Sequence, residues 1–196
     1  MARPSTTSER RAQVLAAYVR AAARHGISGA TLAVVAKEAQ LARSLVRHHL
    51  GNKDRMFDLL VEHVVEETNR QTAQLAEALP QDARMEALID HLFSAPPDPG
   101  PQLIFVFADL TMKAVTDRAL ASKLSTTFTT FEAVIIAELR RAAPAASDPL
   151  IDTVAHGIGA LYFNAISLAP LGLEPTRAKR AATLLLQSLQ TEVSPP

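Results

Sequence analysis

Residues 31–53 read TLAVVAKEAQLARSLVRHHLGNK, a pattern that predicts two short helices joined by a tight turn. The hydroxyl of Thr31 can accept a hydrogen bond from a backbone amide in the first turn of the first helix. The apolar residues of that helix recur at three- and four-residue spacing and form one buried face: Leu32, Val35, Ala36 and Ala39. We therefore expect a helix-turn-helix in this stretch.

The second helix of the motif is expected to begin after a turn at residues 40–42 and to cover residues 43–50. Val46 and Leu50 lie four residues apart, so both face inward. Polar side chains occupy the outer face: Arg43, Ser44, Arg47 and His48. Gly51 can end this helix, and Asn52 can cap a third helix that starts at residue 53.

The turn AKEAQLAR at residues 36–43, followed by SLVRHHLGNKDRM at residues 44–56, resembles the DNA-binding domain of TetR-type transcriptional regulators. The resemblance extends over about residues 9–60. It implies that the second helix of the motif enters the major groove and that a helical domain behind it dimerises and binds a small ligand. Gln40 stands where the family usually has glycine, so we expect a positive φ there at a cost of about 1 kcal/mol.

The outward residues divide into two expected roles on DNA. Arg43 is the best candidate for bidentate contact to guanine. The expected base contacts are Arg43, Ser44, Leu45 and His48, and the expected phosphate contacts are Thr31, Arg47, His49 and Lys53. Each of these residues taken singly is also compatible with an ordinary exposed side chain.

Charge is distributed unevenly along the 196 residues, although the formal net charge is zero. Residues 1–55 hold ten Lys and Arg against three Asp and Glu, whereas residues 56–196 hold ten against seventeen. A basic reading face and an acidic body suit a protein that contacts phosphates through one region. A chance imbalance of solvated charges is the simpler alternative.

The whole chain is expected to be all-α and to form two domains. Residues 1–52 are expected to form a three-helix, helix-turn-helix DNA-binding domain. Residues 53–196 are expected to form a helical regulatory and dimerisation domain that begins with a connecting helix at residues 53–79. Further helices are expected at residues 82–93, 102–114, 116 or 117 to 142, 150–169 and 176–191, with a buried strand as the weaker alternative at 102–114. Four prolines interrupt residues 94–101.

The last two predicted helices, at residues 150–169 and 176–191, are the expected homodimer interface. A twofold pair of them would bury both apolar faces as a four-helix bundle, and the resemblance implies the same arrangement. Gly157 and Gly159 indicate close approach of another helix. These helices can instead simply close the core of one chain.

Apolar and aromatic residues of the expected regulatory domain are candidates for a ligand pocket, together with a few polar residues among them. The candidates are Phe93, Phe105, Asp109, Met112, Phe128, Phe131, His156, Tyr162, Phe163 and Asn164. Aromatic residues at helical spacing are more often plain core.

Other function classes have little support in the sequence. There is no cysteine, no nucleophile or phosphate-binding motif and no metal-ligand spacing, so we expect neither an enzyme nor a cofactor. No signal peptide or membrane span is expected, which favours a cytoplasmic location without membrane contact. The expected function is a repressor that leaves a palindromic operator when a small apolar or amphipathic effector binds. The alternative is a helical small-molecule carrier that has lost DNA binding.

Overall fold

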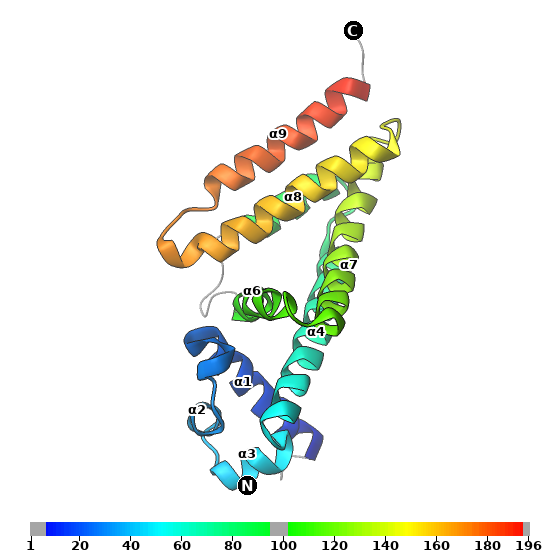
Figure 1. The fold of residues 1–196 in the computed structure, drawn as a ribbon. Coiled ribbons are helices and arrows are strands. Elements are labelled where there is room, and N and C mark those ends of the chain that lie inside the picture. The colour runs from blue at the N-terminus through cyan, green and yellow to red at the C-terminus, as the bar shows by residue number, and fades with distance from the viewer. Residues whose placement is uncertain (1–6, 95–101, 194–196) are drawn as a thin grey trace, which may run out of the picture. The chain divides into compact units, whose positions relative to one another are not determined.

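The computed structural model describes residues 7–94 and 102–193, and within them every regular element is a helix (Figure 1). The all-α prediction is confirmed, and the alternative of a strand at residues 102–114 is wrong. The proline-rich loop lies mostly outside the described residues. The elements are α1 (Thr7–Gly29), α2 (Leu32–Ala39), α3 (Arg43–Leu50), α4 (Lys53–Ala78), α5 (Arg84–Leu92), α6 (Gln102–Ala114), α7 (Arg118–Ala142), α8 (Asp148–Leu168), the 3-10 turn η1 (Ala169–Leu171) and α9 (Thr176–Val193).

The chain forms two compact units. The first unit comprises residues 1–68 and 101–124, and the second comprises residues 69–100 and 125–196. Helix α6 therefore belongs to the same unit as α1 to α3, although about fifty residues separate it in sequence from the end of α3. The expected boundary between residues 52 and 53 divides the chain by role rather than by packing, and it stays a prediction.

In the first unit, α1 packs against both α2 and α6. The side chains of Val14, Val35 and Val46 are fully buried there. The helical backbone of α1 breaks at Gly26, which has φ 70° and ψ 161°. The regular part of α1 therefore ends at Gly26, and a short helical segment at residues 27–29 follows the kink.

Side-chain caps begin three helices where the sequence places polar residues. Thr31 Oγ1 accepts a hydrogen bond from the Val34 amide at 3.4 Å, as predicted. Asn52 Oδ1 accepts from the Arg55 amide at 2.9 Å at the start of α4. Asp117 Oδ1 accepts from the Leu120 amide at 3.0 Å just before α7. These short-range contacts fix the boundaries that the sequence indicates.

The second unit has one apolar core, built from α5, α7, α8 and α9. Its fully buried members include Leu88, Ile135, Leu139, Ile158 and Leu189. A Cβ added at Gly157 would lie 3.0 Å from Leu185 Cδ1, so α8 and α9 pack closely within the same chain. The expectation of a close helix at Gly157 is confirmed.

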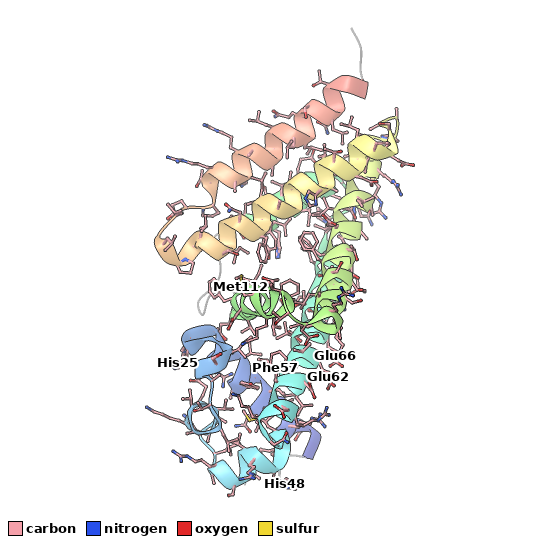
Figure 2. The ribbon with its side chains drawn as sticks, viewed as in Figure 1. His25, His48, Phe57, Glu62, Glu66 and Met112 are labelled. Atoms are coloured by element: carbon pink, nitrogen blue, oxygen red, sulfur yellow. The ribbon has the colours of Figure 1, made fainter. Side chains whose placement is uncertain are left out.

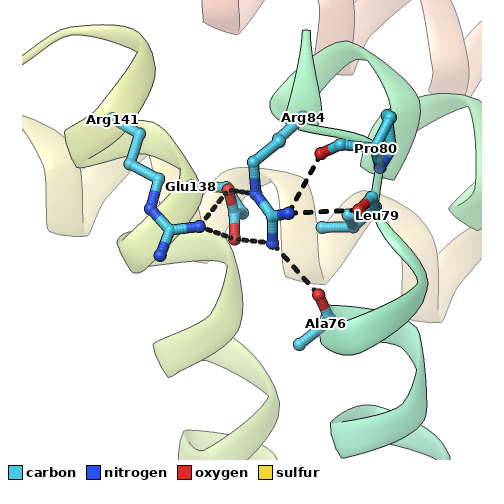
Figure 3. Close-up of polar contacts among 6 residues, drawn as sticks. All are labelled: Ala76, Leu79, Pro80, Arg84, Glu138 and Arg141. Atoms are coloured by element: carbon cyan, nitrogen blue, oxygen red, sulfur yellow. Dashed lines mark hydrogen bonds and ion pairs between the residues drawn. The ribbon is translucent and has the colours of Figure 1, made fainter. Parts of the chain in front are cut away.

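The second unit also contains a buried ion-pair cluster, in which Glu138 of α7 binds Arg84 of α5 and Arg141 (Figure 3). Arg84 Nε and Nη2 donate to the two Glu138 oxygens at 2.8 and 2.9 Å. The same guanidinium donates to the carbonyls that end α4, those of Ala76, Leu79 and Pro80. The hydrogen bond from Arg84 holds the pKa of the Glu138 carboxyl below its ordinary value. Arg84 thus joins three helices.

The start of α5 corrects a prediction. The helix begins at Arg84 rather than Asp82, because Ala83 adopts a left-handed conformation with φ 50° and ψ 38°. Alanine gives no sequence signal for such a conformation, which glycine or asparagine usually adopts. The chain thereby turns sharply before Arg84.

Residues 148–171, which cover α8 and η1, are long and apolar enough to cross a membrane by length and composition. Among the described residues this is the one helix that meets those two criteria, and 22% of its apolar window is buried. Core helices of water-soluble proteins meet the same criteria. The inner face of α8, with Ile151, Val154 and Ile158, packs into the core of the second unit.

Candidate nucleic-acid interface

Helix α3 is anchored by one face and exposed on the other. Val46 and Leu50 are fully buried in the first unit. Arg43, Ser44 and His48 are exposed, as predicted, and Figure 2 shows His48 directed away from the helices behind it. Polar side chains therefore project from a helix that packing holds in place.

The turn that sets the direction of α3 keeps a regular geometry without glycine. Gln40 has φ 56° and ψ 41°, so the expectation of a positive φ is confirmed. The Gln40 amide donates to the Lys37 carbonyl at 3.2 Å, and the Leu41 amide donates to the Ala36 carbonyl at 3.0 Å. Glutamine is therefore accommodated in the turn, with a strain of about 1 kcal/mol.

The predicted DNA-contacting residues lie at two levels of exposure. Leu45 is 37% exposed, and Arg47, Lys53 and Thr31 are also exposed. His49 is half-buried, and its ring lies 5.4 Å from that of His48 in an edge-on arrangement. The hydroxyl hydrogen of Thr31 remains available for a phosphate, because its oxygen acts as the acceptor in the cap.

The acidic residue on α2 is engaged by the first helix. Glu38 accepts hydrogen bonds from Arg20 at 2.8 Å and Arg24 at 3.0 Å. The hydrogen bond from Arg20 lowers the pKa of Glu38, so it stays ionised and paired. Arg43 and Arg47 have no such carboxylate partner within the described ranges, which leaves their charges available to an anionic partner.

The candidate ligand residues divide between the two units. Phe105, Asp109 and Met112 belong to α6 in the first unit, where Met112 is 72% exposed (Figure 2). The other candidates belong to the second unit: Phe93, Phe128, Phe131, His156, Tyr162, Phe163 and Asn164. A ligand role for either group stays a prediction.

Within the second unit, three of the aromatic candidates touch. The Tyr162 ring centroid lies 5.4 Å from that of Phe131 and 6.3 Å from that of Phe93. Burial raises the pKa of the Tyr162 hydroxyl. His156 and Asn164 are exposed, and His156 Nδ1 lies 2.9 Å from Glu132 Oε1. Of the predicted set, Phe93, Phe131 and Tyr162 form an aromatic cluster there.

Asp109 has a backbone partner in the first unit. Its Oδ2 accepts a hydrogen bond from the Ile27 amide at 2.7 Å. No pattern in the sequence indicates this contact, because the two residues are 82 positions apart. In the described part of the chain, no group of three or more His, Cys, Asp or Glu is placed to hold a metal ion.

No family model matches the chain. The HTH-type transcriptional regulator BetI of Paraburkholderia phytofirmans is 32% identical to it over 94 residues. That alignment covers 47% of this chain and 48% of BetI, so the chain spans about half the length of the curated relatives it matches.

Solved structures match over nearly the whole chain. A transcriptional regulator from Rhodococcus sp. Rha1 aligns with 97% of this chain and 100% of its own, with a TM-score of 0.69 and 22% identity. A TetR transcription regulator from Haloarcula marismortui aligns with 92% and 98%, with a TM-score of 0.69 and 18% identity. The multidrug binding protein EbrR, solved with malachite green, aligns with 90% and 98%, with a TM-score of 0.57 and 16% identity.

Proposed function

We propose that this chain, which has the fold of TetR-type transcriptional regulators, is a DNA-binding regulator that reads the major groove with α3. One observation carries the proposal. Val46 and Leu50 are fully buried while Arg43, Ser44 and His48 project outward from the same short helix. A helix anchored in this way presents hydrogen-bonding side chains at the width of a major groove.

The roles of the outward side chains follow from their chemistry. Arg43 would bind guanine with two parallel hydrogen bonds, and Ser44, Leu45 and His48 would meet neighbouring base edges. Thr31, Arg47, His49 and Lys53 would hold phosphates and fix the register. The regular turn at Gln40 removes the main sequence argument for a carrier protein that has lost DNA binding.

A homodimer through α8 and α9 would supply the second reading helix. In the single chain, Leu171, Leu173 and Leu184 of this region are each more than half exposed. A twofold pair of these surfaces would remove them from water and would place two copies of α3 about one DNA turn apart. The operator would then be palindromic, and the protein would act in the cytoplasm.

The regulatory signal would be a small apolar or amphipathic effector that releases the repressor. The cluster of Phe93, Phe131 and Tyr162 supports an aromatic-lined site in the second unit. EbrR, a multidrug binding protein of similar fold, was solved in complex with malachite green. The effector would act by its higher affinity for the conformation that does not fit the operator.

The first test is binding of the purified protein to the DNA upstream of its own gene, over a salt series, against a random duplex of equal length. We expect selective binding whose affinity falls steeply with salt, as counterion release requires. Equal binding to both duplexes at every salt concentration would contradict sequence-specific recognition by α3.

Two substitutions separate the proposed roles. Arg43→Ala should reduce the preference for the operator by about 1–3 kcal/mol, because a bidentate base contact is lost. Lys53→Ala should weaken binding to both duplexes and reduce the salt slope by about one unit. Arg140→Ala is the matched control, since this exposed arginine of the second unit pairs with Asp148.

A further inference from the structure

The contact between Asp109 and Ile27 joins two helices of the first unit that are far apart in sequence. Asp109 lies on α6, and its Oδ2 is 2.7 Å from the amide nitrogen of Ile27. Gly26, the residue before Ile27, is the point where the helical backbone of α1 breaks. A Cβ added at Gly26 would lie 3.6 Å from the same carboxylate oxygen.

The break explains why Ile27 needs this acceptor. The segment at residues 27–29 starts a new helical turn, and the first amides of such a turn have no acceptor in their own helix. A cap residue normally supplies the missing oxygen from just before the helix. Here the carboxylate comes from α6 instead, and a charged acceptor gives a shorter and stronger bond than a neutral one.

The segment held by Asp109 leads directly into the helix-turn-helix. The Ala30 amide donates to the Gly26 carbonyl at 3.0 Å, and the Thr31 amide donates to the Gly29 carbonyl at 2.8 Å. Thr31 then caps α2. Hydrogen bonds of neighbouring residues therefore hold the short segment between the Asp109 contact and the first turn of α2.

Packing between α1 and α6 reinforces the contact. Val106 and Leu110 of α6 are fully buried, and Ile27 is 8% exposed. Asp109 lies between the two buried α6 residues in sequence, so burial of its helix brings the carboxylate to the kink in α1. Removal of the carboxylate would leave a partly buried amide without its acceptor.

We propose that Asp109 is a positioning residue for operator recognition. Its hydrogen bond to Ile27 fixes the point at which the chain leaves α1 for α2, and thereby the placement of α3. This role rests on the proposed function, but it acts through the backbone of α1 and not through contact with DNA. It also gives Asp109 a task different from the ligand role expected from the sequence.

The test compares Asp109→Ala with Asp109→Asn, whose amide oxygen can still accept from Ile27. We expect Asp109→Ala to weaken operator binding about tenfold, a loss typical of one hydrogen bond to a charged group. The salt slope should stay unchanged, because every phosphate contact remains. Asp109→Asn should restore most of the affinity, and Thr111→Ala, an exposed change on the same helix, should have no effect.

A second readout does not depend on DNA. Hydrogen exchange at the Ile27 amide, followed by NMR in the full chain, should be faster in Asp109→Ala and close to wild type in Asp109→Asn. If Asp109→Ala does not fold, Asp109→Ser takes its place. The serine side chain is too short to accept a hydrogen bond from the Ile27 amide, so this variant also removes the contact.

The outcomes separate the two proposals. Faster Ile27 exchange with unchanged operator affinity would overturn the positioning role while the regulator function stands. Equal Ile27 exchange in all variants would overturn the contact itself. A wild-type protein that shows no operator preference would overturn the proposed function, and with it the positioning role, whatever the exchange rates show.

Discussion

Each unit of the molecule contains a glutamate held by two arginines, and the two clusters differ in burial. In the first unit, Glu38 binds Arg20 and Arg24 and keeps 20% of its side chain exposed. In the second unit, Glu138 binds Arg84 and Arg141 and keeps 3% exposed. The two units therefore hold the same kind of ion-pair cluster, one partly exposed to water and one buried.

The difference lies in what else the arginines contact. Arg84 also donates to three carbonyls at the end of α4, so the cluster around Glu138 satisfies backbone groups as well as a charge. Arg20 and Arg24 of α1 donate to Glu38 of α2, and all three side chains remain partly exposed to water. We infer that the first cluster tethers two helices, whereas the second holds together the ends of α4, α5 and α7.

The largest expected effect comes from removing the buried glutamate. Glu138→Ala should lower the free energy of unfolding by about 3 kcal/mol, because it leaves the Arg84 charge uncompensated. Glu38→Ala should cost about 1 kcal/mol or less, as partly exposed ion pairs do. Equal losses of unfolding free energy in the two variants would show that burial does not determine the strength of these clusters.

Tyrosine fluorescence during urea unfolding can assign these losses to a unit. The chain has two tyrosines and no tryptophan, with Tyr18 in the first unit and Tyr162 in the second. The Tyr18→Phe background therefore reports only on the second unit, and the Tyr162→Phe background reports only on the first.

Acid should weaken both clusters. Both glutamates have a pKa held below the ordinary value of 4.5, in each case mainly by a hydrogen bond from an arginine. A depressed pKa in the folded state means that the stabilisation is present above about pH 4.5 and is lost as the pH falls through the folded-state pKa. Glu138→Gln and Glu38→Gln should each flatten the dependence of unfolding free energy on pH below 4.5. A wild-type slope in both variants would exclude the two carboxylates as its source.

A smaller effect, here a gain in the free energy of unfolding, is expected at the two strained turns, one in each unit. Gln40 and Ala83 both have positive φ, at 56° and 50°. Gln40→Gly and Ala83→Gly should each relieve left-handed strain, with a net change between zero and about +1 kcal/mol, because glycine also gains entropy in the unfolded chain. Urea unfolding measures the gain, and Ala33→Gly, within helix α2, is the control expected to lose stability. A clear loss at either turn would contradict the strain.

The smallest effect is expected at an exposed ion pair of the second unit. Arg140 and Asp148 lie 2.9 Å apart with side chains 55% and 76% exposed. Asp148→Asn should change the unfolding free energy by less than about 0.5 kcal/mol. A change as large as that of Glu138→Ala would show that distance, rather than burial, decides the strength of these pairs.

The parts of the fold that depend on near neighbours were predictable from the sequence. Each of three capping side chains accepts a hydrogen bond from an amide three residues later: those of Thr31, Asn52 and Asp117. The cap and the helix that it starts are therefore predicted from the same short stretch of sequence. The outward direction of Arg43 and the burial of Val46 followed from helical periodicity alone.

Contacts between distant residues were not predictable in the same way. Arg84 and Glu138 are 54 positions apart, and neither has a neighbour in sequence that indicates the partner. The same holds for Asp109, whose position on an apolar helix suggests a ligand role and does not indicate its backbone partner, Ile27. The left-handed conformation of Ala83 was not predictable, because alanine has no preference for it.

The discontinuous first unit has a consequence for synthesis on the ribosome. Residues 1–68 leave the ribosome before α6, which completes their packing, and the following residues 69–124 take roughly 3 to 11 s to translate at bacterial to eukaryotic rates. During that interval the face of α1 that α6 later covers is open to solvent and to chaperones. The nascent helix-turn-helix therefore acquires its final support only after more than half of the chain has been made.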